Sequence, residues 1–322
     1  MKKILIVGAG GQIGSELVPY LRSIYGETNV VAADISAEKC KALAEAGPFE
    51  ELNALDGEGF SAIVKKYNID TIFNLVALLS ATGEKNPKLA WDINIGALTN
   101  SLYIAKDNNC AVFTPSSIGA FGNDTPKDKT PQDTLQRSNT TIYGVCKVTG
   151  ELLSDYYFHR FGVDTRSVRF PGLISYVTLP GGGTTDYAVE IYYDAIRKGS
   201  FTCNVKEGTY MDMMYMPDAL NAVVQLMEAD PSKLKHRNSF NIASMSFEPE
   251  QIAAEIRKHM PDFKLDYQID PVKQAIANSW PNSMDDTCAR QEWGWAPKYD
   301  LTSMTNDMLI KVKEKFDKGL VK

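Results

Sequence analysis

The chain has 322 residues, 44% of them hydrophobic and 23% charged, and its formal net charge is −6. This composition is ordinary for a folded protein with a full core, in one large domain or two smaller ones. No basic block points to nucleic acid, and no apolar run approaches membrane-spanning length. The five cysteines form no CxxC pair, which predicts reduced thiols, no metal site and a cytoplasmic location.

The N-terminal residues predict a dinucleotide site. An apolar strand over residues 3–7 leads into the loop Gly8-Ala-Gly-Gly-Gln-Ile-Gly14 and a helix predicted over residues 15–25. Such a unit brings backbone N–H groups and a helix N-terminus to a pyrophosphate. Glycines at 8, 11 and 14 keep a three-residue spacing, whereas the more usual pattern requires glycine in place of Ile13. A plain glycine turn is the alternative interpretation.

An acidic residue closes the second predicted strand. This strand spans residues 29–33, and Asp34 follows it. An acid here accepts hydrogen bonds from the adenosine ribose and repels a 2′-phosphate, which favours NAD over NADP. Alternatively, Asp34 caps a helix predicted over residues 36–46. A third strand is predicted over residues 49–52, and Asp56 beyond it is a candidate for the adenine edge or for a turn.

The next segment adds two candidate residues. A fourth strand over residues 70–76 runs toward Ser80, and ligands of open α/β sheets lie beyond the carboxyl ends of the strands. Asn94 lies in a helix predicted over residues 87–106. A buried amide there needs partners, so it either fixes the helix against a neighbour or takes part in a proton path.

The leading catalytic candidates are Tyr143 and Lys147, which lie one turn apart on one face of a helix predicted to end near residue 161. A free tyrosine keeps its proton at neutral pH, but a fixed ammonium beside it favours the phenolate. Ser117, which follows a fifth strand over residues 111–114, offers a hydroxyl to the same substrate oxygen. We predict that this trio removes the proton of a secondary alcohol while a hydride leaves the carbon. A helix that carries Tyr and Lys by chance is the alternative.

The last third of the chain predicts a small substrate lobe. The glycines at 181–183 form a flexible loop that closes over a ligand, or a linker without a role, and they lead into Thr184 and Thr185. Trp280 either closes the apolar side of a pocket or belongs to the core. The other predicted elements are a surface loop over 122–139, a sixth strand over 163–169, helices over 186–198 and 217–228, a strand near Phe240 and, after residue 247, helices with one short strand.

The order of these motifs resembles the extended short-chain dehydrogenase/reductase family over nearly the whole chain, including the closing Glu292-Trp-Gly-Trp-Ala-Pro297. The resemblance implies an α/β fold, with a Rossmann doubly wound parallel sheet and a smaller C-terminal α/β substrate lobe. We expect the NAD-binding domain over residues 1–172, completed by about 214–242, and the substrate lobe over 173–213 and 243–322.

The resemblance also implies roles for single residues. Tyr143 would be the general base, Ser117 would hold the reacting oxygen and Lys147 would bind the nicotinamide ribose. Asn94 would take part in the proton relay. The expected cofactor-binding residues are Gly8, Gly11, Gln12, Ile13, Gly14, Asp34, Asp56, Leu75, Ala77, Tyr143, Lys147 and Pro171. The expected substrate-binding residues are Ser80, Ser117, Tyr143, Thr184, Thr185 and Trp280.

Two subfamilies compete. Sugar-nucleotide epimerases carry an Asn after the sixth strand and an Arg before the strand near residue 215. Here Gly172 replaces the Asn, and no arginine lies between Arg197 and Arg237. Without an arginine clamp a diphosphate would be poorly held. Five stretches instead resemble the short-chain type of L-threonine 3-dehydrogenase, namely residues 78–84, 115–122, 169–175, 181–188 and 279–284.

This second resemblance implies NAD-dependent oxidation of the β-hydroxyl of L-threonine to 2-amino-3-oxobutyrate. Ser80 and Thr184 or Thr185, with backbone N–H groups, are expected to hold the carboxylate. A homodimer through the helices near 87–106 and 140–161 is also implied. The alternatives are a nucleotide-sugar 4-epimerase or dehydratase, and a non-enzymatic NAD-sensing protein, which would not need the intact catalytic trio.

Overall fold

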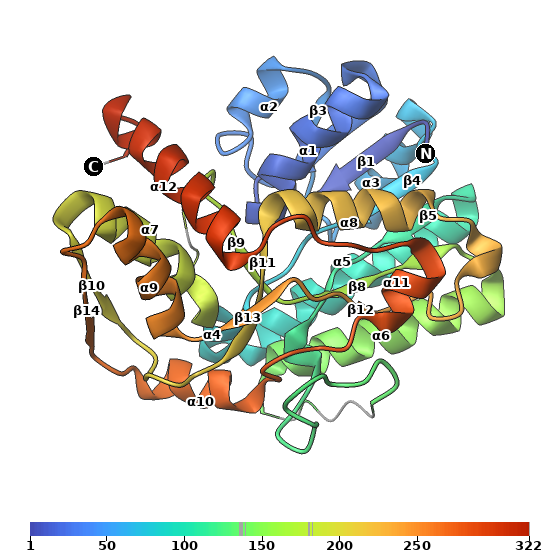
Figure 1. Ribbon diagram of the computed structural model, residues 1–322. Coiled ribbons are helices and arrows are strands. Elements are labelled where there is room, and N and C mark those ends of the chain that lie inside the picture. The colour runs from blue at the N-terminus through green and yellow to red at the C-terminus, as the bar shows by residue number, and fades with distance from the viewer. Residues whose placement is uncertain (135–137, 139, 180, 182, 322) are drawn as a thin grey trace.

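A six-stranded parallel sheet with strand order β3-β2-β1-β4-β5-β7 forms the centre of the molecule in a computed structural model, which describes residues 1–134, 138, 140–179, 181 and 183–321 (Figure 1). This order is that of a Rossmann doubly wound sheet, so the predicted fold class is confirmed. The strands are β1 (Ile4–Val7), β2 (Val30–Asp34), β3 (Phe49–Glu51), β4 (Thr71–Asn74), β5 (Ala111–Phe113) and β7 (Thr165–Arg166).

Helices bury both faces of this sheet, which explains why β1 is apolar throughout. Ile4 and Ile6 pack with α1 (Gln12–Tyr25) and α8 (Met216–Glu228). Leu5 and Val7 point to the other face. The helices on that face are α3 (Gly57–Tyr67), α5 (Pro87–Asn108) and α6 (Ile142–Phe161). Burial of each such side chain contributes about 1.5–3 kcal/mol, so the sheet anchors the loops at its carboxyl edge.

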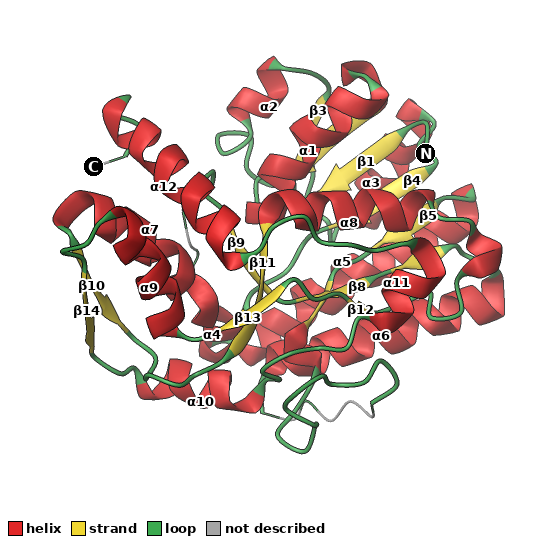
Figure 2. Cartoon of the chain, viewed as in Figure 1, coloured by secondary structure: helices red, strands yellow, loops and turns green. Residues whose placement is uncertain are grey.

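The C-terminal part of the chain packs beside the main sheet (Figure 2). Four of its helices share a hydrophobic cluster that also includes Ile118 and Phe121. These helices are α7 (Tyr187–Lys198), α9 (Pro249–His259), α10 (Pro271–Ser279) and α12 (Leu301–Asp317). The other C-terminal helix, α11 (Thr287–Trp293), packs in the cluster that contains side chains of α1 and α8. Three small sheets are ordered β12-β8-β6, β13-β11-β9 and β10-β14. The domain boundaries stay a prediction.

The remaining elements are short. The strands of the small sheets are β6 (Ser116–Ser117), β8 (Val168–Phe170), β9 (Gly172–Ile174), β10 (Ser200–Cys203), β11 (Met211–Tyr215), β12 (Phe240–Asn241), β13 (Met245–Phe247) and β14 (Lys264–Tyr267). The short helices are α2 (Lys41–Glu45), α4 (Ser80–Lys85), η1 (Glu27–Asn29), η2 (Ile118–Ala120), η3 (Thr184–Asp186) and η4 (Pro231–Lys233). Within the described residues, none of the helices has the length and apolar character needed to span a membrane.

The predicted sixth strand is in fact two strands in different sheets. β7 pairs with β5, whereas β8 pairs with β12 and β6. The chain changes partner at Ser167, whose carbonyl accepts N–H bonds from Ser239 and Phe240 and whose N–H donates to Arg237 O. The prediction of one continuous strand over 163–169 was therefore wrong, because the backbone partners of Ser167 lie far along the chain.

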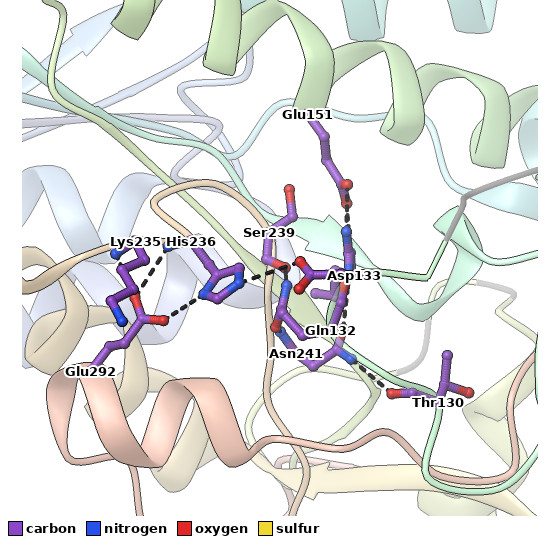
Figure 3. A network of polar contacts seen from close by, with 10 residues as sticks. Thr130, Gln132, Asp133, Glu151, Lys235, His236, Ser239, Asn241 and Glu292 are labelled. Atoms are coloured by element: carbon purple, nitrogen blue, oxygen red, sulfur yellow. Dashed lines mark hydrogen bonds and ion pairs between the residues drawn. The ribbon is translucent and has the colours of Figure 1, made fainter.

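The predicted surface loop over 122–139 is partly buried. Thr130 is fully buried and Gln132 nearly so. Gln132 Nε2 donates to Ser239 O (2.8 Å), and Asn241 donates its backbone N–H to Gln132 Oε1 (2.7 Å) and its side-chain amide to Thr130 O (3.0 Å; Figure 3). The prediction of a surface loop was wrong for these residues; residues 135–137 and 139 lie outside the described part of the chain.

Candidate active site

A pocket lies beyond the carboxyl ends of the central strands, and an adjoining groove continues along the glycine loop. Leu75 and Ala77, which follow β4, line both spaces. The pocket is lined by Gln12, Ile13, Leu79, Ser80, Pro115–Ile118, Tyr143, Lys147, Phe170–Leu173, Gly183–Asp186 and Trp280. The groove is lined by residues that include Gly8, Gly10, Gly11, Asp34, Ile35 and Leu52–Leu55. One continuous trench thus joins nearly all of the predicted site residues.

The glycine loop has the shape of a phosphate cradle. Gly8 has a φ of +86°, and a Cβ on it would lie 3.1 Å from the backbone of Leu75. A Cβ on Gly14 would lie 2.5 Å from Gly8 O, so only glycine lets α1 pack this closely on the loop. The N-cap of α1 is Gly11, which has no side chain to cover the first N–H groups. These N–H groups are therefore free to bind an anion.

Asp34 joins the end of β2 to the glycine loop. Its Oδ2 accepts the Gly10 N–H (2.9 Å) and its Oδ1 accepts the Ser36 N–H (3.0 Å). The helix-cap alternative for Asp34 is wrong, because α2 begins only at Lys41 and has Cys40 as its N-cap. Each carboxylate oxygen keeps a lone pair. Since Asp34 lines the groove, it is placed to accept hydroxyl groups there.

Asp56 has a structural role. Its Oδ1 accepts the Gly59 N–H (3.0 Å), and Asp56 is the N-cap of α3. The groove wall is instead formed by the preceding residues, Leu52–Leu55. The structure therefore favours the turn interpretation of Asp56 over contact with adenine.

The three predicted catalytic residues, Ser117, Tyr143 and Lys147, line the pocket together. Lys147 Nζ donates to Pro115 O (2.6 Å) and lies 5.3 Å from the centroid of the Tyr143 ring. Ser117 Oγ accepts the Gly119 N–H (3.1 Å). A Cβ on Gly119 would lie 3.2 Å from the Tyr143 ring, so this glycine lets the ring pack against the backbone that carries Ser117. The ammonium and the two hydroxyl groups thus face one space.

The start of α6 fixes the position of Tyr143. Thr141 is the N-cap and its hydroxyl accepts the Gly144 N–H (3.0 Å). Ser138 donates its hydroxyl to Gly119 O (2.7 Å), and a Cβ on Gly144 would collide with this hydroxyl. Tyr143 therefore sits in the first turn of a capped helix, which restricts its ring to the pocket.

Asn94 clamps the loop after β4. Its Oδ1 accepts the Leu78 N–H (2.7 Å) and its Nδ2 donates to Leu78 O (3.2 Å). This agrees with the structural alternative for Asn94. Asn94 and Lys147 also line one small cavity behind the pocket, so the relay role stays a prediction.

The predicted substrate residues come from three segments. Ser80 begins α4 and is buried, and Trp280 closes the other side of the pocket at the end of α10. Thr184 is only 1% exposed, and its Oγ1 has no hydrogen-bond partner among the described residues. The Thr185 methyl instead lies against Gly172. The glycines of the predicted loop include Gly182, which lies outside the described residues.

Asp186 is a pocket residue that the sequence reasoning missed. Its Oδ2 accepts the Gly183 N–H (2.5 Å), and it lines the pocket beside Thr184. Its position directly after two candidate threonines could have indicated a pocket residue. The sequence analysis instead assigned Asp186 to the start of the following helix. The pocket thus holds one carboxylate and one ammonium among its described lining residues.

The segment that leads from β9 to this loop is held by side chains from both ends of the chain. Ser175 donates its hydroxyl to Glu16 on α1 (2.5 Å). Lys315 on α12 donates to Tyr176 O (2.7 Å) and Val177 O (2.9 Å). Burial raises the pKa of Glu16 to about 7, although the Ser175 hydrogen bond and Lys315 oppose this shift.

Comparison with known proteins shows the family of the chain. Residues 4–243 match the NAD dependent epimerase/dehydratase family. The chain is 58% identical to an uncharacterized epimerase/dehydratase of Staphylococcus haemolyticus, over 98% of this chain and 99% of that protein. A structure of L-threonine dehydrogenase from Clostridium difficile is 58% identical, with a TM-score of 0.96 and coverage of 98% of both chains. The holo form of a GalE-like L-threonine dehydrogenase from Cupriavidus necator is 48% identical, with a TM-score of 0.93 and coverage of 96% and 99%.

Proposed function

We propose that this chain, which belongs to the NAD dependent epimerase/dehydratase family, is an NAD-dependent L-threonine 3-dehydrogenase. The family and its solved relatives support an NAD-dependent oxidoreductase. The proposed reaction converts the β-hydroxyl of L-threonine to a ketone and yields 2-amino-3-oxobutyrate. The substrate itself is inferred from the walls of the pocket.

The observation that carries the proposal is the packing at Gly172. A Cβ on this residue would lie 2.4 Å from Met213 Sδ and 2.7 Å from Thr185 Cγ2. The Asn that sugar-nucleotide epimerases carry at the corresponding position would require the Met213 and Thr185 side chains to move. Among the described lining residues the pocket also has no arginine, and the Lys147 ammonium already donates to Pro115 O. A diphosphate would therefore lack its usual partners.

The pocket suits an amino acid instead. The buried hydroxyl of Thr184, which has no partner among the described residues, and the hydroxyl of Ser80 would bind the substrate carboxylate, together with nearby backbone N–H groups. The Asp186 carboxylate would attract the ammonium of the substrate and repel a phosphate. Opposite charges at the two ends of the ligand would thus fix which face of the β-carbon meets the trench.

The residues of the trio would then move the proton. Tyr143 would take the proton of the β-hydroxyl while Ser117 Oγ holds the same oxygen. Lys147, oriented by Pro115 O, would stabilise the developing phenolate. When NAD is bound, its nicotinamide supplies the hydride acceptor.

The groove fits NAD. Gly8 and Gly14 leave the space that a Cβ would fill, and the N-terminus of α1 offers free N–H groups. Asp34 would bind the adenosine ribose and repel a 2′-phosphate, and the described cation that lines the groove is Lys39, with no arginine among the described lining residues. We therefore propose a preference for NAD over NADP.

We also propose a homodimer formed through α5 and α6. Six large hydrophobic side chains of these helices are exposed: Leu89, Trp91, Tyr103, Leu152, Tyr156 and Phe161. A contiguous apolar patch on two packed helices is a typical protein interface. A size measurement that gives only monomer would overturn this part.

A panel of alcohols with NAD tests the function. We expect L-threonine to produce NADH, followed by absorbance, and UDP-sugars to give neither NADH nor an epimer. An epimerised UDP-sugar with inert threonine would refute the proposal. Binding of NAD without turnover of any alcohol would favour the NAD-sensing alternative.

A further inference from the structure

Three side chains of metal-ligating types meet beside β12, away from the trench. His236, Cys288 and Glu292 place their ligand atoms within 4.8 Å of one another. Cys288 and Glu292 are four residues apart on α11 and so lie on the same face of that helix. His236 comes from the segment before β12. The sequence predicted no metal site, because the five cysteines form no CxxC pair and His236 is far from Cys288 along the chain.

Each side chain is already oriented. Glu292 Oε2 accepts the N–H groups of Lys235 (2.6 Å) and His236 (3.1 Å), and its Oε1 contacts His236 Nδ1. His236 Nε2 lies 3.3 Å from Asp133 Oδ1, and Figure 3 shows the imidazole between the two carboxylates. Backbone hydrogen bonds that fix a carboxylate act as outer-shell contacts do in metal sites.

The charges around Cys288 favour a cation. The carboxylates of Glu292, Asp133 and Asp285 lie near the Cys288 thiol, and Lys235 is the nearby cation. The other four cysteines are buried, so Cys288 is the most accessible thiol of the chain. A divalent ion placed there would meet these negative charges favourably.

We propose that His236, Cys288 and Glu292 form a binding site for Zn²⁺ or a similar thiophilic divalent cation, with water as the fourth ligand. His236 would bind the ion through Nδ1, and its Nε2–H would donate to Asp133 as an outer-shell contact. Imidazole, thiolate and carboxylate together are a ligand set that suits Zn²⁺ and not Mg²⁺. Binding would release the thiol proton to solvent, so the affinity should rise with pH. The ion would replace the contact between His236 and Glu292 and join the segment before β12 to α11.

The site is tested on the untagged, reduced, full-length protein after treatment with EDTA. Isothermal titration with Zn²⁺ should show one saturable site, and Cd²⁺ should produce the ultraviolet charge-transfer band of a cadmium–thiolate bond. Mg²⁺ in excess should not compete. Cys288→Ser and His236→Gln should each weaken Zn²⁺ binding at least about 10-fold, and Cys288→Ser should remove the cadmium band. His259→Gln, which alters an exposed histidine on α9, is the matched control and should bind normally.

Thermal melts add a readout of the link between segments. Zn²⁺ should raise the melting temperature of the unaltered protein and of His259→Gln, but not of Cys288→Ser. If the unaltered protein shows no saturable Zn²⁺ binding, the cluster only joins two segments by hydrogen bonds and the proposal fails. The proposal would also fail if Cys288→Ser and His236→Gln bound Zn²⁺ as tightly as the unaltered protein does. Neither result bears on threonine oxidation.

Discussion

Replacing Thr184 by valine should strengthen the fold and weaken catalysis at the same time. The hydroxyl is 1% exposed and has no partner among the described residues. An unpaired buried polar group costs about 1–3 kcal/mol, and valine has nearly the same shape without the hydroxyl. In the absence of substrate, Thr184→Val should therefore be more stable by about that amount.

The size of the shift follows from the chain length. At about 2.1 cal/mol/K per residue, 322 residues give an unfolding entropy of roughly 0.7 kcal/mol/K. A gain of about 1–3 kcal/mol then raises the melting temperature by about 1.5–4 °C. With threonine bound, the same change loses a hydrogen bond to a carboxylate, worth about 1.5–3 kcal/mol, or about 10- to 100-fold in kcat/KM.

Thermal melts without substrate and steady-state kinetics with threonine measure the two effects. Thr185→Val is the matched control, because the Thr185 methyl packs on Gly172 and the side chain is only partly buried. It should leave kcat/KM within a few-fold of normal. Unchanged efficiency in Thr184→Val, or a lower melting temperature, would show that this hydroxyl serves the fold and not the ligand.

Three further changes test the trench and its support. Tyr143→Phe should keep NAD binding and lose turnover on the order of 100-fold or more, while Ser117→Ala should lose less. Near-normal turnover in Tyr143→Phe would show that Tyr143 is not the general base. Asp34→Ala should weaken NAD binding and reduce the ratio of kcat/KM with NAD to kcat/KM with NADP. Equal use of both cofactors by the unaltered protein would contradict the role of Asp34 in cofactor choice. The pKa of Glu16 is raised from 4.5 to about 7, so in this pH range the folded state binds a proton that the unfolded state has released. The free energy of unfolding should therefore fall by up to about 3 kcal/mol as the pH rises from about 4.5 to 7, and should stay level above pH 7. Glu16→Gln should abolish this fall in urea unfolding at about pH 5 and pH 8, and an unchanged pH profile would place the titration elsewhere.

The sequence predicted the features that depend on local pattern. The apolar run of β1, the glycines that follow it and the acid at the end of β2 are close together in the chain, and the structure brings Gly8, Gly11 and Asp34 into one groove. The spacing of Tyr143 and Lys147 fixed their common face in the same way, because four residues make about one helical turn.

The sequence could not predict features set by distant partners. The break between β7 and β8 occurs because Ser167 pairs with backbone near residue 239. Thr130 is buried because backbone near residues 283–285 pairs with it. Asp186 was missed because an acid at a helix start is ordinary, and only the packing of η3 against the pocket makes it a ligand candidate.

The choice of substrate depends on the pocket walls more than on the trio. Ser117, Tyr143 and Lys147 suit any secondary alcohol that reaches them. A Cβ at position 172 would press on Met213 and Thr185, and under the proposed function Asp186 would oppose a phosphate by its charge. Neither residue takes part in the proton transfer. Changes at these walls should therefore alter which alcohol binds while the chemistry at the hydroxyl stays the same.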